Sequence, residues 1–244
     1  NRFNYTNLIK FLKSNPGLKI TGLKIIPSSE DLSELRPYLH NLTKLIVINA
    51  DKVSSMDYSV LSECKKLTHL EANQKGKVLP YLINCEELEY LEIEGSEEKD
   101  LTVENKKLKH LKMHGFPKGE LNLTKCKKLR SLMMYDSNLE SIKLPINNSL
   151  RDLLIVNVDD VDFSFLAMCK SLKFLEISSG NTVFDLNILS GLNELEILNL
   201  IRLEISGNLN EMAKLKKLTL KVDKLGSGAH SELPKLPVSL ESLE

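Results

Sequence analysis

One short pattern recurs through almost the whole chain and restricts how it can fold. The pattern is L-x-x-L-x-L, where L stands for Leu, Ile, Val, Met or Ala, and its mean spacing is 22 residues over eleven occurrences. Its first position falls at Ile20, Leu42, Leu67, Leu88, Leu108, Leu129, Leu150, Leu172, Leu195, Leu215 and Leu240. A repeat of this length predicts a solenoid, in which each unit packs against its neighbours.

The second half of the pattern, L-x-L, predicts a short strand. Residues two apart face the same side of a strand, so both apolar residues point the same way. Each strand is too short to be stable alone, and parallel stacking buries the apolar sides as one continuous core. The opposite side of the strands is then left as an exposed, concave sheet.

A longer match identifies the kind of repeat. The segment from Leu129 to Leu139 resembles the longer consensus of the leucine-rich-repeat family, with Ser137 where Asn or Cys is usual. The resemblance covers Ile20 to Leu243. It implies an α/β leucine-rich-repeat solenoid, or horseshoe, with a parallel concave sheet and short helices or turns on the convex side.

The resemblance also implies a division of the chain. We expect an N-terminal capping helix within residues 1–19, because Thr6 to Lys13 has an amphipathic pattern that can cover the first repeat. Residues 20–244 then form a solenoid of about eleven repeats. The last repeat stops in mid-pattern at Glu244, so we expect it to be truncated at the C-terminus.

A second string precedes several of the strand patterns. It reads Leu-x-x-Cys-x-x-Leu and contains Cys64, Cys85, Cys126 and Cys169. Apolar spacing of three to four residues predicts a helical turn on the convex side before each strand. Two start signals are added to it: residues 54–57 resemble an acidic capping box, and residues 29–35 predict another short helix.

The four cysteines share one repeat position, which elsewhere holds Leu39, Leu192 or Met212. We therefore interpret them as buried apolar residues rather than as disulfides, zinc ligands or a nucleophile. Unpaired buried thiols favour a reducing compartment. The predicted location is intracellular, in the cytoplasm or nucleus, with secretion left open.

Charge and hydropathy exclude two kinds of partner. Lys+Arg and Asp+Glu both number 33, so the formal net charge is zero and the basic excess of a nucleic-acid-binding protein is missing. The longest apolar runs are only a few residues long, which excludes membrane insertion. The expected partner is another protein, of unknown identity.

No catalytic, cofactor-binding or metal site is predicted. The sequence contains no phosphate-binding glycine loop, zinc-protease motif or nucleophile elbow. His110 and His114 share a strand face, but four residues of strand separate them by about 13 Å, too far for one metal ion. Asp159, Asp160 and Asp162 lack the Gly and the terminal Glu of a calcium loop and are interpreted as a solvated turn. We therefore predict no enzyme activity and no cofactor.

The exposed positions of the strands lie two, four and six residues after each first Leu. In the middle repeats they include an apolar stretch and a small acidic patch. A contiguous exposed apolar surface usually marks an interaction site. The predicted partner-binding residues are Met133, Tyr135, Leu154, Val156, Phe174, Ile197 and Ile201, with Tyr90, His110, His114, Glu71, Glu92 and Glu94 beside them.

Two narrower resemblances indicate different functions. Segments 64–70 and 169–177 resemble the cysteine-containing repeats common in F-box proteins, the substrate receptors of ubiquitin ligases, although the repeats here are shorter and no F-box segment is present. This implies an adaptor that holds a substrate on its concave face. Leu144-Pro145 and Leu236-Pro237 are similar to the LP-type repeats of secreted bacterial effectors. The alternatives are therefore an interaction module of an adaptor, or the recognition domain of a pathogen effector or of a larger enzyme whose catalytic domain lies elsewhere.

Overall fold

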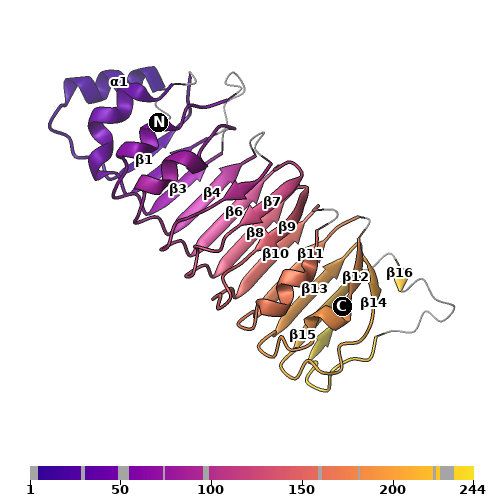
Figure 1. The fold of residues 1–244 in the computed structure, drawn as a ribbon. Helices are drawn as coiled ribbons and strands as arrows, with labels where there is room; N and C mark the ends of the chain where they lie inside the picture. The colour runs from indigo at the N-terminus through magenta and orange to yellow at the C-terminus, as the bar shows by residue number, and fades with distance from the viewer. Residues whose placement is uncertain are drawn as a thin grey trace.

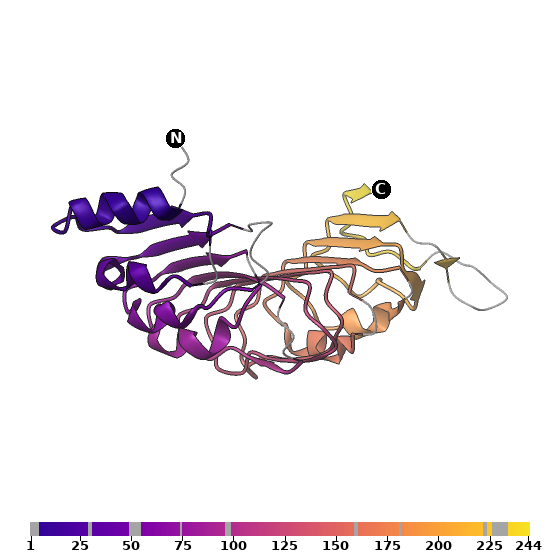
Figure 2. The same ribbon diagram turned by 90° about the horizontal axis from the view of Figure 1, so that it is seen from above.

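The structure is a computed structural model that describes residues 5–28, 31–48, 55–73, 75–95, 99–158, 161–180, 182–221, 224–225 and 234–244. In this part of the chain, parallel strands form one 11-stranded sheet that runs along the molecule (Figure 1). Seen from above, the molecule is an arc whose inner side carries the sheet and whose outer side carries short helices (Figure 2). This is the horseshoe solenoid that the repeat predicts.

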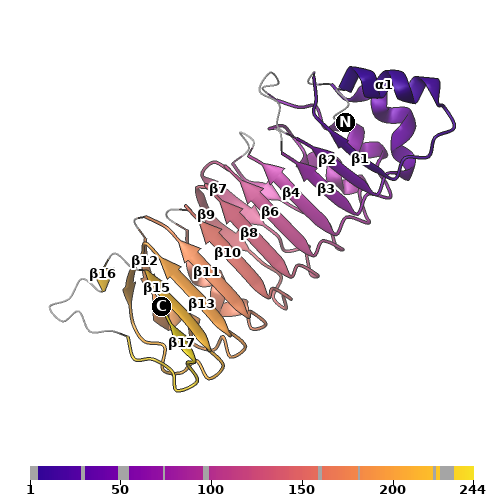
Figure 3. The same ribbon diagram turned by 180° about the vertical axis from the view of Figure 1, so that it is seen from behind.

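The strands follow the repeat one by one and lie side by side along the sheet (Figure 3). Each strand pairs with the next at the same repeat position, so Leu70 lies beside Leu91, and Leu91 beside Leu111. The strands of the sheet are β1 (Gly22–Ile25), β2 (Lys44–Val47), β3 (His69–Ala72), β4 (Tyr90–Glu94), β6 (His110–His114), β8 (Ser131–Tyr135), β10 (Asp152–Val156), β11 (Phe174–Ser178), β13 (Ile197–Ile201), β15 (Lys217–Lys221) and β17 (Ser242–Leu243).

The aligned leucines form the core of the molecule. In β4 the side chains alternate between half-buried and buried, and Leu91 and Ile93 are the buried ones. Leu70, Leu91, Leu111 and Leu132 are at most 1% exposed, and they belong to one hydrophobic cluster that extends through the repeats. Each repeat therefore buries its apolar side only because its neighbours cover it.

The convex layer combines short 3-10 helices with short strands. Its helices are η1 (Ser33–Asn41), η2 (Ser59–Glu63), η3 (Leu79–Asn84), η4 (Phe163–Met168) and η5 (Leu186–Leu189). Its strands form two small parallel sheets, β5 (Leu101–Thr102), β7 (Gly119–Asn122) and β9 (Leu139–Lys143), and β12 (Val183–Asp185), β14 (Glu204–Ser206) and β16 (Lys224–Leu225).

Repeat length explains part of this mixture. The repeats 88–107 and 195–214 have 20 residues each and cross the convex side as the strands β5 and β14. The repeat 172–194 has 23 residues and accommodates η5. A strand advances about 3.3 Å per residue and a 3-10 helix about 2.0 Å, so the shorter repeats must be extended to span the same width.

The extended middle repeats correct one prediction. The sequence predicted a helical turn before each cysteine, and this is wrong at Cys126, which follows the strand β7. Neighbouring convex strands approach closely here. A Cβ atom on Gly119 would lie 2.0 Å from the carbonyl oxygen of Lys99, so only glycine fits at that position.

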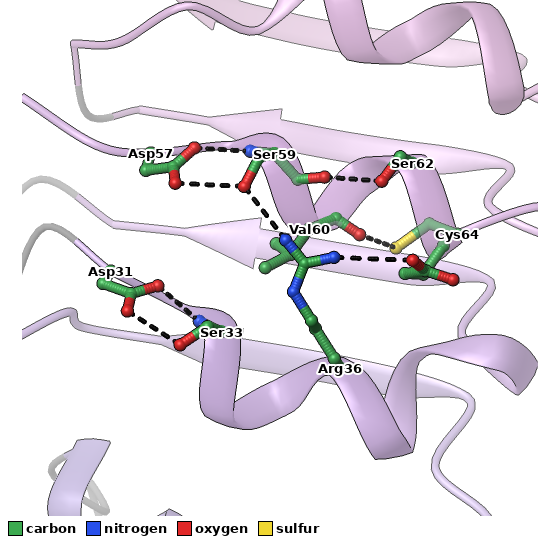
Figure 4. A network of polar contacts seen from close by, with 9 residues as sticks. Asp31, Ser33, Arg36, Asp57, Ser59, Val60, Ser62 and Cys64 are labelled. Carbon is green, nitrogen blue, oxygen red and sulfur yellow. Dashed lines mark hydrogen bonds and ion pairs between the residues drawn. The ribbon is translucent and has the colours of Figure 1, made fainter.

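Aspartates start the convex helices in several repeats. Asp31 and Asp57 each accept hydrogen bonds from the N–H and the hydroxyl of the serine two residues later, Ser33 and Ser59 (Figure 4). Asp162 repeats the motif with Ser164, and the two hydrogen bonds lower the pKa of Asp162. Such side chains satisfy N–H groups that the first turn of a helix leaves unpaired.

These turns correct the predicted helix starts. The short helix expected over residues 29–35 begins at Ser33 and continues to Asn41, while residues 29 and 30 lie outside the described residues. Residue 54, the first of the expected capping box, also lies outside them, and Asp57 itself caps the turn. Of the expected solvated acidic turn, Asp162 is described and is exposed, whereas residues 159 and 160 are not described.

A helix covers the N-terminal end of the sheet. The predicted amphipathic helix forms as α1 (Tyr5–Ser14), with Tyr5, Ile9 and Leu12 buried. On its polar side, Lys13 Nζ lies 2.6 Å from Glu34 Oε2 at the start of η1. None of the helices in the described ranges is both long and apolar enough to cross a membrane.

Candidate interaction surface on the concave sheet

The concave face carries the residues that the sequence placed on it. Because the strands are in register, the exposed positions form three rows that cross the sheet from strand to strand. One row contains Tyr90, His110, Phe174 and Ile197, the next contains Glu71, Glu92, Met133 and Leu154, and the third contains Glu94, His114, Tyr135, Val156 and Ile201. Their side chains are half-buried, apart from His110, which is exposed.

The rings on the N-terminal half of this face stack on one another. The ring centroids of His69 and Tyr90 are 4.2 Å apart with planes within 4° of parallel. Those of His114 and Tyr135 are 4.8 Å apart with an angle of 9°. These spacings are close to the distance between neighbouring strands, so register alone brings the rings into contact. Each such pair contributes about 0.5–1.5 kcal/mol beyond its buried area.

The charges of the same half are paired within the chain. The Tyr90 hydroxyl donates to Glu92 Oε2 at 2.9 Å, and Lys112 Nζ donates to Glu92 Oε1 at 3.2 Å. Lys112 Nζ also lies 5.6 Å from the centre of the Tyr135 ring. Burial, followed by the hydrogen bond and charge of Glu92, raises the pKa of Tyr90. Glu92 is thus the centre of a network that spans three strands.

Glu71 is paired in a similar way. Its Oε1 atom lies 2.7 Å from His69 Nε2 and 3.8 Å from Lys44 Nζ. Of the three acidic residues predicted as a patch, only Glu94 has no ion pair among the described residues. We call His69, Glu71, Tyr90, Glu92, Lys112, His114 and Tyr135 the aromatic–charged cluster.

The apolar stretch on the C-terminal half is divided in two. Met133 lies beside Leu154, and Tyr135 beside Val156, which gives a patch on β8 and β10. Phe174 lies beside Ile197, with Ile201 further along β13, which gives a second patch on β11 and β13. Between them Glu176 lies beside Leu154, and Ser178 beside Val156. The sequence predicted one continuous stretch, whereas the register places polar residues across its middle row.

The division is fixed by a hydrogen bond. Asn199 Nδ2 donates to Glu176 Oε2 at 3.0 Å, so two polar side chains occupy the middle row of β11 and β13. Phe174 still lies diagonal to Leu154, and diagonal neighbours about 7–8 Å apart remain within reach of an aromatic ring. A partner that covers the surface therefore meets two apolar patches with a polar pair between them.

Sequence reasoning listed Lys112 on the concave face but did not include it among the binding residues. Its role depends on Glu92 and Tyr135, which are contributed by the strands on either side of β6. The signal was present in the sequence as equal repeat positions in adjacent repeats, which hold Glu92, Lys112 and Met133 in one row. Pairing equal positions across repeats would have found it.

The cysteines are structural, as predicted. All four are free and at most 1% exposed, and burial raises the pKa of each thiol to about 12. Their S–H groups donate to backbone carbonyls, as in the 3.2 Å contact from Cys126 to Val103. Asn105 takes the same repeat position and donates to the carbonyls of Leu82 and Cys85, both at 3.1 Å. In the described ranges no group of His, Cys, Asp and Glu side chains is arranged to hold a metal ion.

Solved structures share this architecture. The leucine-rich-repeat domain of APL1 matches with a TM-score of 0.68 and 14% identity over 96% of this chain and 68% of that one. An internalin from Listeria monocytogenes matches with a TM-score of 0.52 and 20% identity over 98% and 75%. TLR13, solved in complex with an RNA, matches with a TM-score of 0.57 and 18% identity over 99% and 38%.

These similarities establish the fold as a leucine-rich-repeat solenoid, which confirms the predicted fold class. No protein-family model matches the chain, and no curated protein matches its sequence.

Proposed function

We propose that this solenoid is a protein-interaction module, without enzyme activity of its own, that binds a partner protein on its concave face. The observation that carries the proposal is the pair of apolar patches on β8–β10 and β11–β13. The fold needs the buried leucines beneath them, but it does not need Leu154, Phe174 or Ile197 on the outer side of the strands. Apolar side chains gathered on an open surface are typical of interaction sites.

The charge of the molecule favours a protein as the partner. Basic and acidic residues balance at 33 each, and the cations Lys44 and Lys112 on the concave face are paired with Glu71 and Glu92. Binding of nucleic acid depends on cations that neutralise phosphates, and such cations should be free to do so. TLR13 is a leucine-rich-repeat protein solved with RNA, but nothing comparable to a basic strip supports that partner here.

The experiment requires the natural partner, captured with the intact chain from the source cell. Phe174→Ala and Tyr135→Ala should each weaken its binding by about 2 kcal/mol or more, because aromatic side chains in central positions dominate interface energies. The matched control is Ile146→Ala on the convex side, where the side chain is 85% exposed. Loss of binding in the control, with both concave variants unchanged, would overturn the proposal.

We further propose that the module is intracellular and selects the substrate of a ubiquitin ligase. Its support is the cysteine-containing repeat string, together with four thiols that are all unpaired. The captured partner should carry more ubiquitin when the intact chain is expressed than when Phe174→Ala is expressed. Recovery of the native protein from the medium, with unchanged ubiquitin on the partner, would instead favour the secreted-effector alternative.

A further inference from the structure

The convex layer contains a cleft where it changes from helix to strand. The cleft lies between η3 and β5 and has a volume of about 770 Å³. One wall carries Leu79 and Ile83 of η3, and the other carries Thr102 of β5. Ile83 is 67% exposed, a large fraction for an apolar side chain at the wall of a cleft.

The same step from helix to strand occurs a second time in the molecule, between η4 and β12, and there it is filled. The rings of Phe163 and Phe184 meet edge to face with centroids 5.2 Å apart. Phe163 precedes Cys169 by six residues, as Leu79 precedes Cys85. Phe184 is the buried residue of β12, as Leu101 is of β5. Leucines in place of phenylalanines therefore leave the first step open, and the fold itself does not require the opening.

The open step exposes the edge of a sheet. β5 is the first strand of the sheet β5–β7–β9, and it has β7 on one side only. The N–H of Val103 donates to the carbonyl of Asn122 at 3.0 Å, toward β7. Because backbone groups alternate in direction along a strand, the N–H and C=O of Thr102 point to the other side, into the cleft. Such an edge can pair with an added strand.

The floor and the mouth of the cleft are well defined. Asn105 ties the floor to η3 through its hydrogen bonds to Leu82 and Cys85. At the mouth, Lys107 is held by Glu87 at 2.6 Å. Glu86 and Glu104 line the cleft and form no ion pair in the described part of the chain. The remaining charge is therefore acidic.

We propose that this cleft binds an extended segment of a partner protein, added as a strand to the free edge of β5. An apolar side chain of the segment packs between Leu79 and Ile83, and a neighbouring Lys or Arg pairs with Glu86 or Glu104. The strand edge supplies backbone hydrogen bonds, while the apolar wall and the acidic mouth supply the sequence preference. This surface is on the opposite side from the concave patches, and the inference does not rest on their function.

The probe is a library of short random peptides, displayed and selected against the intact chain. Selected peptides should alternate apolar and basic residues, and fluorescent copies should bind in an anisotropy titration. Leu79→Phe, which imitates the filled step, and Ile83→Glu should each weaken the binding by about tenfold or more. Ile146→Glu, another exposed convex isoleucine, and the concave variant Phe174→Ala should leave it unchanged.

Hydrogen exchange supplies a readout that a general loss of stability would not give. On addition of the selected peptide, the amide of Thr102 should exchange more slowly, because its N–H gains a strand partner. The proposal is overturned if selection yields no peptide whose binding drops in Leu79→Phe. It is also overturned if such a peptide binds without protection of Thr102.

Discussion

The two halves of the concave face share one scaffold and differ in how their exposed residues are satisfied. In the aromatic–charged cluster, Glu92 accepts hydrogen bonds from Tyr90 and Lys112, and the rings stack across strands. On the apolar half, Phe174 and Ile197 lie side by side with solvent above them. The first half completes its interactions within the chain, whereas the second leaves apolar surface that a partner can cover.

The lesson is that equal register does not produce equal surfaces. Neighbouring strands place the same repeat position side by side in both halves. Opposite charges and rings at those positions form contacts with each other. Aliphatic side chains at the same positions cover one another only in part. The cluster therefore contributes to stability, and the apolar patches contribute to recognition.

The largest expected effect tests the shared scaffold. Leu111 lies beneath the cluster and Leu175 beneath the apolar half, and both are at most 1% exposed. Changing either one to Ala should lower the free energy of unfolding by about 2–5 kcal/mol, through lost burial and the cavity left behind. Urea unfolding measures it. A loss below about 1 kcal/mol at one site only would show that the two halves are not equally supported.

The next effect concerns the cysteine layer. Cys126→Ser should cost about 1–3 kcal/mol, because a buried hydroxyl has a poorer environment than a thiol. The pKa of each thiol is raised to about 12 in the folded protein, so folding holds the thiol protons more tightly than the unfolded chain does. The thiols therefore stabilise the fold at neutral pH, and this contribution is lost as the pH rises above the unfolded value of about 8.5.

The thiols provide two checks on this layer. Native protein should react slowly with a thiol reagent at neutral pH, whereas denatured, unreduced protein should show four free thiols. A disulfide found by peptide mapping without reduction would contradict the assignment. Rapid reaction of the native protein would show that the layer opens far more often than a buried core should.

A smaller effect separates the cluster from the apolar patches. Tyr90→Phe removes the hydroxyl that donates to Glu92 and keeps the ring that stacks on His69. The expected loss is about 0.5–1.5 kcal/mol in the free energy of unfolding. Combined with Glu92→Gln in a double-mutant cycle, the two changes should be non-additive. Leu154→Ala combined with Ile197→Ala should be additive, because two strand positions separate these side chains. Equal coupling in both cycles would remove the distinction between the halves.

The smallest effect on stability joins the two apolar patches. Glu176→Leu removes the acceptor of the Asn199 hydrogen bond and places an apolar side chain beside Leu154. The free energy of unfolding should change by no more than about 0.5 kcal/mol, as for other surface positions. Binding of the partner, or self-association measured by sedimentation, should change more than stability. If neither changes, the polar pair does not shape the interface.

Several features were predictable because they depend on one repeat at a time. The alternation in Leu88–Ile93 identifies the strand β4 and the side that is buried, and the buried residues of β4 are Leu91 and Ile93. The shared position of Cys64, Cys85, Cys126 and Cys169 predicts burial, and all four are buried. The amphipathic pattern at the N-terminus predicts α1, which forms with Ile9 and Leu12 on its buried side.

Other features depend on what adjacent repeats bring together. The salt bridge of Lys112 with Glu92, the polar division at Glu176 and Asn199, and the open step beside Leu79 each involve residues about one repeat apart. A period of two determines which side of a strand a residue faces. It does not determine which side chain is its lateral neighbour, because that depends on strand pairing between repeats of unequal length. The sequence alone determined the solenoid, the register of its core and the thiol layer, and only the tertiary structure decided which exposed side chains satisfy one another and which remain open to a partner.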